Sequence, residues 1–150
     1  MRFVRLLSAI VTVLTFLVIV FGKIVRVTGA SDSIPDWPLA FGQLVPEMTP
    51  LVFWEWSHRL LALLTVITML ALIACAARVS ARLCLYCVVS LLLLVATALI
   101  GGLSILYPLH WGWAAADQAL AMLFFASIVG LAVWSRMTAT ISARSGSAAG

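Results

Sequence analysis

Three ionisable residues, Glu55, His58 and Arg59, stand close together at the start of a long apolar stretch that carries no further charge until Arg78. Their spacing of i, i+3 and i+4 places all three side chains on one face of a helix. A charged group in a bilayer costs at least about 2.5–3.5 kcal/mol, so its presence at the end of a membrane helix indicates a function. A histidine beside a carboxylate and a guanidinium is typical of bound metal or haem, or of proton transfer.

The composition indicates that these residues belong to an integral membrane protein. Apolar residues make up 65% of the 150 residues. Only 9% of the residues are charged, against about 25% in soluble domains. Lipid cannot satisfy free backbone groups, so stretches this apolar must cross the membrane as helices. Four stretches are long enough to cross, at about residues 6–27, 51–77, 83–107 and 114–134.

We therefore predict an all-α fold, in which residues 1–137 form a four-helix transmembrane bundle and residues 138–150 form a flexible cytoplasmic tail. The Gly101-Gly102 pair in the third span is interpreted as a site of close helix packing.

The basic residues predict how the bundle is oriented. Three segments carry basic residues without acidic ones, through Arg2, Arg5, Arg78, Arg82, Arg136 and Arg144. The positive-inside rule places these segments, and with them both termini, in the cytoplasm. Segments 28–50 and 108–113 then face outward. Five tryptophans fall at this outer level, as expected of an aromatic belt: Trp37, Trp54, Trp56, Trp111 and Trp113.

His58 on the second span and Asp117 on the fourth are predicted to lie at the same depth, close to the outer face. Each precedes the inner end of its span by about the 20 residues that cross the hydrocarbon core. His110 stands seven residues before Asp117, roughly 10 Å further out, and is expected in the outer loop. Because independent structural charges need not share a level, the coincidence of depth favours a functional layer.

A pocket with an apolar floor and a basic rim fits an amphiphilic ligand with acidic groups at one end, and haem matches that description. Its iron would take a histidine, and its propionates would meet Lys23, Arg26 or Arg59. The orientation rule disagrees with the outer position of Lys23 and Arg26, and both could instead extend towards the lipid headgroups.

The other residues of the layer also have structural interpretations. His58 could be a hydrogen-bonded structural histidine. Glu55 and Arg59 could form a plain ion pair across one helical turn. Asp117 could serve only to neutralise Arg59.

Several motifs resemble the haem A synthase family, and more closely the amino-terminal four-helix half of its members. The resemblance covers roughly residues 20–65. Its motifs are Gly22-Lys-Ile-Val-Arg26-Val-Thr28-Gly29, Pro35-Asp36-Trp37-Pro38-Leu39, Gly42-Gln43 and Glu55-Trp-Ser-His58-Arg59-Leu-Leu-Ala.

The resemblance implies a function. Members of the family usually have eight helices in two similar halves, of which one holds haem b and the other receives haem O. They oxidise a methyl group of haem O to the formyl group of haem A for cytochrome oxidase assembly. By resemblance, His58 is expected to bind the iron of haem b, and Glu55 to be a catalytic or proton-handling carboxylate. Arg26, Lys23, Arg59 and Asp117 are the further expected haem-binding residues.

The chain departs from the family pattern in three places. It has one half only, so we expect a homo-oligomer or a second four-helix subunit. Ile34 and Ala40 stand about where many members carry a cysteine pair. Asp117-Gln118 occupies the place of the expected histidine of the fourth helix, which leaves an open iron position.

Two alternatives remain beside the enzyme. The chain could be a non-catalytic haem-binding or oxidase-assembly module, or a haem subunit that transfers electrons. In each case the lipid bilayer is its surroundings, and no nucleic acid is expected as a partner. The expected location is a bacterial or archaeal cytoplasmic membrane, or the mitochondrial inner membrane, with the site near the outer face.

Overall fold

A computed structural model describes the backbone of residues 1–106 and 111–147, and the side chains of residues 1–104 and 112–137. The described chain forms the helices α1 (Arg2–Thr28), α2 (Pro50–Ala77), α3 (Ala81–Leu106) and α4 (Trp111–Ser147), with one short 3-10 helix, η1 (Ala30–Asp32). All four α-helices are long and apolar enough to cross a membrane. The predicted all-α fold of an integral membrane protein is therefore confirmed.

The helix ends follow from local sequence. Gly29 ends α1 in the left-handed conformation that glycine adopts without strain. Thr49 precedes α2, and its side-chain oxygen accepts a hydrogen bond from the Val52 N–H at 3.4 Å. Pro50 occupies the first turn of α2, where no backbone N–H is needed. Helix α4 continues to Ser147, through most of the segment 138–150 whose flexibility stays a prediction.

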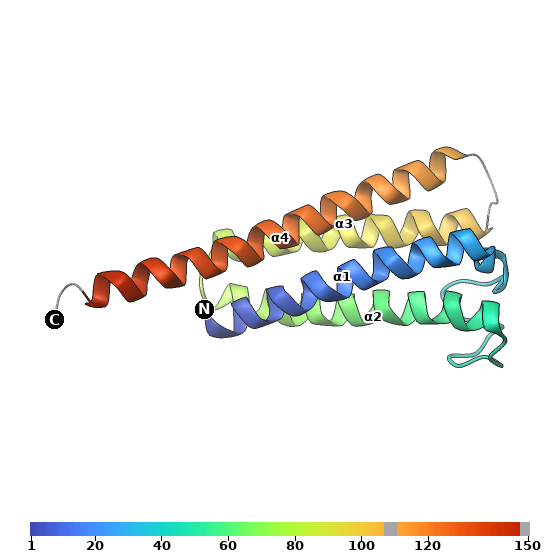
Figure 1. Ribbon diagram of the computed structural model, residues 1–150, viewed down its shortest axis with the longest axis horizontal. Coiled ribbons are helices and arrows are strands. Elements are labelled where there is room, and N and C mark those ends of the chain that lie inside the picture. The colour runs from blue at the N-terminus through green and yellow to red at the C-terminus, as the bar shows by residue number, and fades with distance from the viewer. Residues whose placement is uncertain (107–110, 148–150) are drawn as a thin grey trace.

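The four helices pack in a ring, in which α1 contacts α2 and α4, and α3 contacts α2 and α4. Figure 1 shows that the start of α1 and the end of α4 lie at the same end of the bundle, which we call the inner end. The loop between α1 and α2, residues 29–49, lies at the opposite end, which we call the outer end. This arrangement agrees with the prediction that both termini lie on the same side of the membrane.

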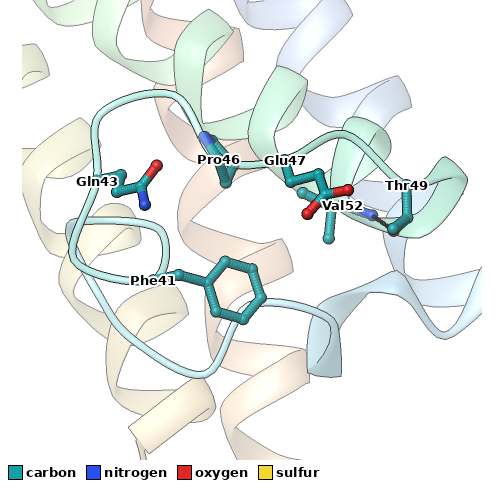
Figure 2. Close-up of a pocket in the computed structure, with 6 residues that line it drawn as sticks. All are labelled: Phe41, Gln43, Pro46, Glu47, Thr49 and Val52. Carbon is teal, nitrogen blue, oxygen red and sulfur yellow. Dashed lines mark hydrogen bonds between the residues drawn. The ribbon is translucent and has the colours of Figure 1, made fainter.

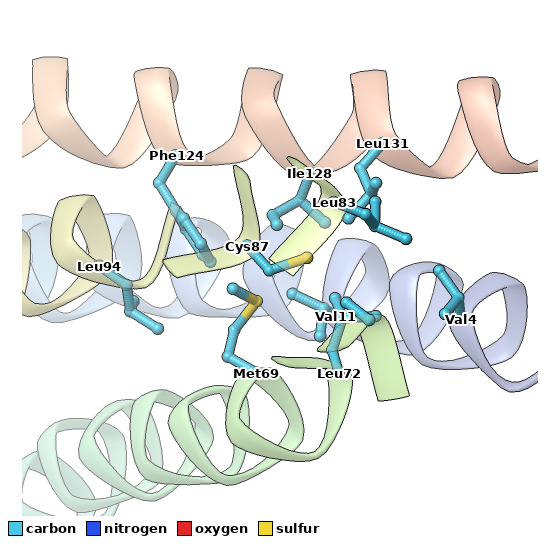
Figure 3. Close-up of a cluster of buried hydrophobic side chains, with 11 residues drawn as sticks. Val4, Val11, Met69, Leu72, Leu83, Cys87, Leu94, Phe124, Ile128 and Leu131 are labelled. Carbon is cyan, nitrogen blue, oxygen red and sulfur yellow. The ribbon is translucent and has the colours of Figure 1, made fainter. Parts of the chain in front are cut away.

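The packed core occupies the inner half of the bundle. Figure 3 shows side chains from all four helices meeting there, among them Val11 of α1, Met69 of α2, Cys87 of α3 and Phe124 of α4. These side chains are buried to 1% exposure or less. Because this half is sealed by apolar packing, any ligand-binding space must lie further out.

The side of the membrane on which the two termini lie is a direct test of the orientation. We expect a reporter fused after Gly150 to be active in the cytoplasm, because the basic residues near the inner end have no acidic neighbours. The measurement compares a cytoplasm-active fluorescent protein with an export-active phosphatase at the same position. Phosphatase activity without fluorescence would show that the orientation is reversed.

Candidate functional site

The outer loop folds around the carboxylate of Asp36. Its two oxygens accept hydrogen bonds from the N–H groups of Phe41 at 2.7 Å and Gly42 at 2.8 Å. The hydrogen bond from Gly42, followed by that from Phe41, holds the pKa of Asp36 below its ordinary value despite an opposing effect of burial. Phe41 and Gly42 both have positive φ, 54° and 70°, as the two central residues of a type I′ turn require. The carboxylate therefore fixes the backbone of a turn that phenylalanine rarely adopts.

Arg59 connects this loop to α2. Its Nε donates to the Glu55 Oε1 at 2.7 Å, which forms an ion pair across one helical turn. Its Nη1 donates to the backbone carbonyls of Asp36 and Leu39, both at 2.8 Å. Its Nη2 donates to the Ile34 carbonyl at 3.4 Å. The planar guanidinium, with five donors in fixed directions, suits this multiple role.

Apolar packing and a tryptophan complete the attachment of the loop. Ile34, Ala40 and Val52 form a small buried cluster, against which Trp56 packs. The Trp56 Nε1 donates to the Leu44 carbonyl at 2.9 Å. The two positions at which relatives of the resembled family often carry cysteines are thus occupied here by an apolar contact. The loop is held by packing and hydrogen bonds among the described residues.

A variant series at Arg59 tests this attachment. Arg59→Gln should destabilise the protein by about 2–3 kcal/mol, because it removes charged hydrogen bonds and leaves the buried Glu55 without its cation. Arg59→Lys is the matched control, since it keeps the charge and loses the fork that reaches the loop carbonyls. Thermal unfolding in detergent and proteolysis of residues 33–48 give the two measurements. We expect Arg59→Lys to loosen the loop and to unfold at a higher temperature than Arg59→Gln; equal behaviour of all three proteins would contradict this role.

His58 lies in the interior between α2 and α1. Its ring rests on Gly22, where an added Cβ would lie 2.9 Å from the imidazole Cε1. The Nδ1 atom is buried and makes no hydrogen bond of standard distance and angle among the described residues, although the backbone of Val18 on α1 lies near the ring. Two other buried side-chain atoms, Arg5 Nε and Ser33 Oγ, are in the same condition. The weakly bonded imidazole is therefore the group of this interior that is free to meet a ligand.

Asp117 faces the same interior from α4. Its Oδ1 lies 3.6 Å from the place of a Cβ at Gly101, so the carboxylate packs beside the glycine pair of α3. Its side chain is half-buried, and it interacts electrostatically with His58 and Arg26. Lys23 is exposed near the outer end of α1, and His110 lies outside the described residues. The structure thus brings Glu55, His58, Arg59 and Asp117 together, whereas Arg26, within electrostatic range of Asp117, and Lys23 are both exposed at the outer end of α1.

The helices carry no buried side chain at the level of His58. We call this region the His58 layer; it comprises residues 16–24 of α1, 56–64 of α2, 95–101 of α3 and 112–123 of α4, none of which is buried. It extends over roughly 15 Å of helix. Several of its residues on α3 and α4 are small and half-buried, namely Ala96, Ala98, Gly101, Gly112, Ala114, Ala116 and Ala121. These half-buried small residues leave surface that a ligand can cover, which makes the His58 layer the candidate binding region.

The chemistry of the layer fits a porphyrin better than a bare metal ion. Within the described part of the chain, no three His, Cys, Asp or Glu side chains come together to hold an ion. A porphyrin brings its own ring nitrogens, so that one histidine can complete the protein's share of the ligands. The apolar walls and the basic residues at the outer end match its macrocycle and propionates.

A separate hollow of about 300 Å³ lies on the outer loop. Figure 2 shows its six lining residues, which come from the loop and the start of α2: Phe41, Gln43, Pro46, Glu47, Thr49 and Val52. None of these residues belongs to the His58 layer. We therefore place the candidate site in the layer and not in this hollow.

Comparison with known proteins shows what the chain is similar to. The cytochrome oxidase assembly protein family (COX15-CtaA) matches residues 5–52. A protein named Heme A synthase from Bacillus pumilus is 32% identical over 134 residues, which cover 86% of this chain and 44% of that protein. Over most of its length the chain is thus similar to part of a haem A synthase. A second Heme A synthase, from Symbiobacterium thermophilum, is 40% identical over 70 residues, which cover 47% of this chain and 23% of the relative.

The relatives are longer than this chain, which spans less than half the length of either. No solved structure matches it. The family match at residues 5–52 covers α1, the outer loop and the start of α2, and therefore includes the loop that Arg59 holds.

The structure adds contacts to which the sequence analysis gave no role. Gly22 supports the His58 ring, and Gly102 contacts Trp37 of the outer loop. The interpretation of Gly101-Gly102 as a helix-packing site is therefore refined, since one glycine faces Asp117 and the other faces a loop residue. Residue type alone gave a signal at Gly22, because a glycine one helix away from a histidine leaves space for its ring.

Proposed function

We propose that the chain is a half-size, haem A synthase-like membrane protein that oxidises a methyl group of haem O to the formyl group of haem A for cytochrome oxidase assembly. The observation that carries this proposal is the buried, weakly bonded imidazole nitrogen of His58 in a layer where no helix contributes a buried side chain. Relatedness to proteins named Heme A synthase supports the choice of reaction.

Each site residue is given a role according to where it lies. His58 is proposed to hold the iron of a haem b, which when bound supplies the redox chemistry. Arg26 and Lys23, at the outer end of α1, are proposed to bind propionates. Arg59 donates its hydrogen bonds to Glu55 and to loop carbonyls. We therefore propose that it positions the loop and does not bind a propionate.

Glu55 is the proposed proton-handling carboxylate. It is 3% exposed and lies one turn before His58 on the same face of α2. The Arg59 guanidinium pairs with it at 2.7 Å and orients it. Asp117 faces the layer from the opposite side and can accept a hydrogen bond there. Two carboxylates on opposite walls can take up the protons that a methyl oxidation releases.

We propose that two copies of this chain, or this chain and a second four-helix subunit, form the working unit. One bundle offers one described histidine and one His58 layer, whereas the reaction needs a place for haem b and a place for haem O. The length of the relatives, more than twice the matched part in each case, agrees with a second bundle.

Pigment analysis in a cell that makes haem O and lacks its own haem A synthase tests the proposal. The wild-type chain should lead to haem A in extracted pigments, and Glu55→Gln should retain bound haem b while haem A disappears. A chain that binds haem b but yields no haem A from haem O would contradict the enzyme. A wild-type and a Glu55→Gln protein of equal yield would contradict the role of Glu55.

One observation favours a second candidate, a non-catalytic haem-binding or assembly module. In the described part of α4, Asp117 faces the layer and no histidine is present, so one bundle lacks the second iron ligand that the resemblance predicts. The pigment experiment separates the two candidates, because the module retains haem b without producing haem A.

A further inference from the structure

The outer loop leaves the end of α1 and reaches α3, which stands opposite α1 in the ring of helices. The Trp37 indole lies on Gly102, where an added Cβ would stand 2.8 Å from both Cδ2 and Cε2 and 3.2 Å from Cε3. Contact with three atoms around the ring junction means that the body of the indole covers the glycine. Gly102 is buried although it has no side chain, and Trp37 stays 36% exposed. The indole therefore seats the loop on α3 and keeps its outer edge accessible.

The contact between Trp37 and Gly102 is one of a series of contacts that surround the His58 layer. Arg59 holds the loop on α2 through the carbonyls of Asp36 and Leu39, on either side of Trp37. Next to the seat, Gly101 contacts Asp117 of α4. Asp117 interacts across the layer with His58, the neighbour of Arg59. The loop thus leaves α1 and is attached to the neighbouring helices α2 and α3 at the outer end of the layer.

We propose that residues 33–43 form a roof over the His58 layer, and that the Trp37 seat on Gly102 controls passage of a porphyrin-sized ligand between the layer and the outer surface. Trp37 and Gly102 are positioning residues in this scheme, because they act through the loop. The identity of the ligand rests on the proposed function, whereas the roof rests on the contacts of the loop with α2 and α3.

The alternative route for such a ligand is sideways, between two helices and through the lipid. The attachments of the roof favour the outer route. The loop is fixed on α2 by three hydrogen bonds from one guanidinium, whereas the contact with α3 at the described residues is apolar, the Trp37 indole on Gly102. A hinge at Arg59 with release at Gly102 would open the layer without breaking the ion pair of Glu55.

The accessibility of a cysteine at position 117 tests whether the roof covers the layer, and the test needs no haem. The Asp117→Cys protein in nanodiscs, where both faces meet the reagent, is labelled with a polar maleimide. The parent chain, with Cys75, Cys84 and Cys87, gives the background. Gly102→Ala and Trp37→Ala should each raise the labelling rate of Cys at 117 by about tenfold, which corresponds to a shift of about 1.4 kcal/mol in the opening equilibrium.

Two matched controls accompany these variants. Gly130→Ala adds the same methyl group in the inner half of α4, where its nearest contact is an ordinary 3.8 Å to the Tyr86 hydroxyl. Trp134→Ala removes a tryptophan that is 48% exposed from the same inner part of α4. Both controls should label at the rate of the Asp117→Cys protein. Equal rates in all five proteins would overturn the roof, and so would a rise in the controls as large as that in the test variants.

Haem transfer to apomyoglobin then tests the passage of the ligand. These variants keep the natural Asp117. Gly102→Ala and Trp37→Ala should each accelerate haem loss and haem uptake together, and leave the equilibrium haem content unchanged. A merely structural role would instead lower the haem content without accelerating uptake, and would overturn the gating. If the wild-type chain binds no haem, the proposed function fails, and the cysteine measurement still decides the roof.

Discussion

Replacement of His58 by alanine is expected to remove most of the haem from the purified protein while the protein still folds in the membrane. His58 is the one histidine among the described side chains, and its ring stands in the His58 layer with a buried nitrogen that makes no hydrogen bond of standard distance and angle. An iron ligand is not replaced by neighbouring side chains when the nearest polar groups are carboxylates. Absorption spectra and haem content per protein give the measurement.

The fold should tolerate this change for a physical reason. The wild-type protein without ligand bears part of the cost of about 1–3 kcal/mol that an unpartnered buried nitrogen carries, and alanine removes it. The lost packing of the ring on Gly22 opposes this gain. We therefore expect the ligand-free His58→Ala protein to unfold within a few degrees of the ligand-free wild type, so that haem loss cannot be attributed to unfolding.

His110→Ala is the matched control, because the sequence analysis expects His110 in the outer loop, away from the apolar interior. It should retain haem. Equal haem content in the wild type and the His58→Ala protein would end the proposal that His58 binds iron. Loss of haem in His110→Ala, with retention in His58→Ala, would show that His110 and not His58 binds the iron.

Much of the fold could be predicted because bilayer physics leaves few options. An uncharged stretch of 20 residues must become a helix, and the predicted second span, 51–77, agrees with α2, Pro50–Ala77, to within one residue. The limits of α4 were harder to predict, since its last residues are polar and a hydropathy signal ends at the membrane surface whereas the helix continues to Ser147.

The loop contacts could not be predicted in the same way. Arg59 finds its carbonyl partners 20–25 positions earlier in the chain, in a loop whose shape depends on the turn that Asp36 holds. The sequence analysis identified the Glu55–Arg59 pair because both residues lie on one helix, where spacing alone sets the geometry. It gave Arg59 a propionate as a further partner, because periodicity carries no information about backbone carbonyls in a distant loop.

The contacts of the glycines could not be predicted from the sequence either. The pairing of Gly22 with His58, and of Gly102 with Trp37, depends on how α1 and α3 rotate about their axes. A glycine pair in a membrane helix predicts a close approach but does not tell whether another helix or a loop tryptophan makes it. The depth of Asp117, in contrast, followed from counting residues, and the structure brings it within electrostatic range of His58.

Asp117→His is expected to change the spin state of the bound haem. Asp117 projects into the His58 layer from the opposite side of the bundle, and Gly101 beside it leaves room for a longer ring. In a single wild-type bundle, His58 would be the one histidine on the iron, so a high-spin spectrum is expected. A histidine at position 117 should supply the second imidazole and convert the spectrum to that of a six-coordinate, low-spin haem.

Two further proteins make this result specific. Asp117→Asn, which resembles the wild-type residue in size and has no imidazole, should keep the high-spin spectrum. His58→Ala combined with Asp117→His should lose the low-spin spectrum, because it again leaves one imidazole. A wild-type protein that already shows two histidines on its iron would contradict the open position. The second ligand would then come from His110 or from a neighbouring subunit, and the working unit would join its bundles through the iron itself.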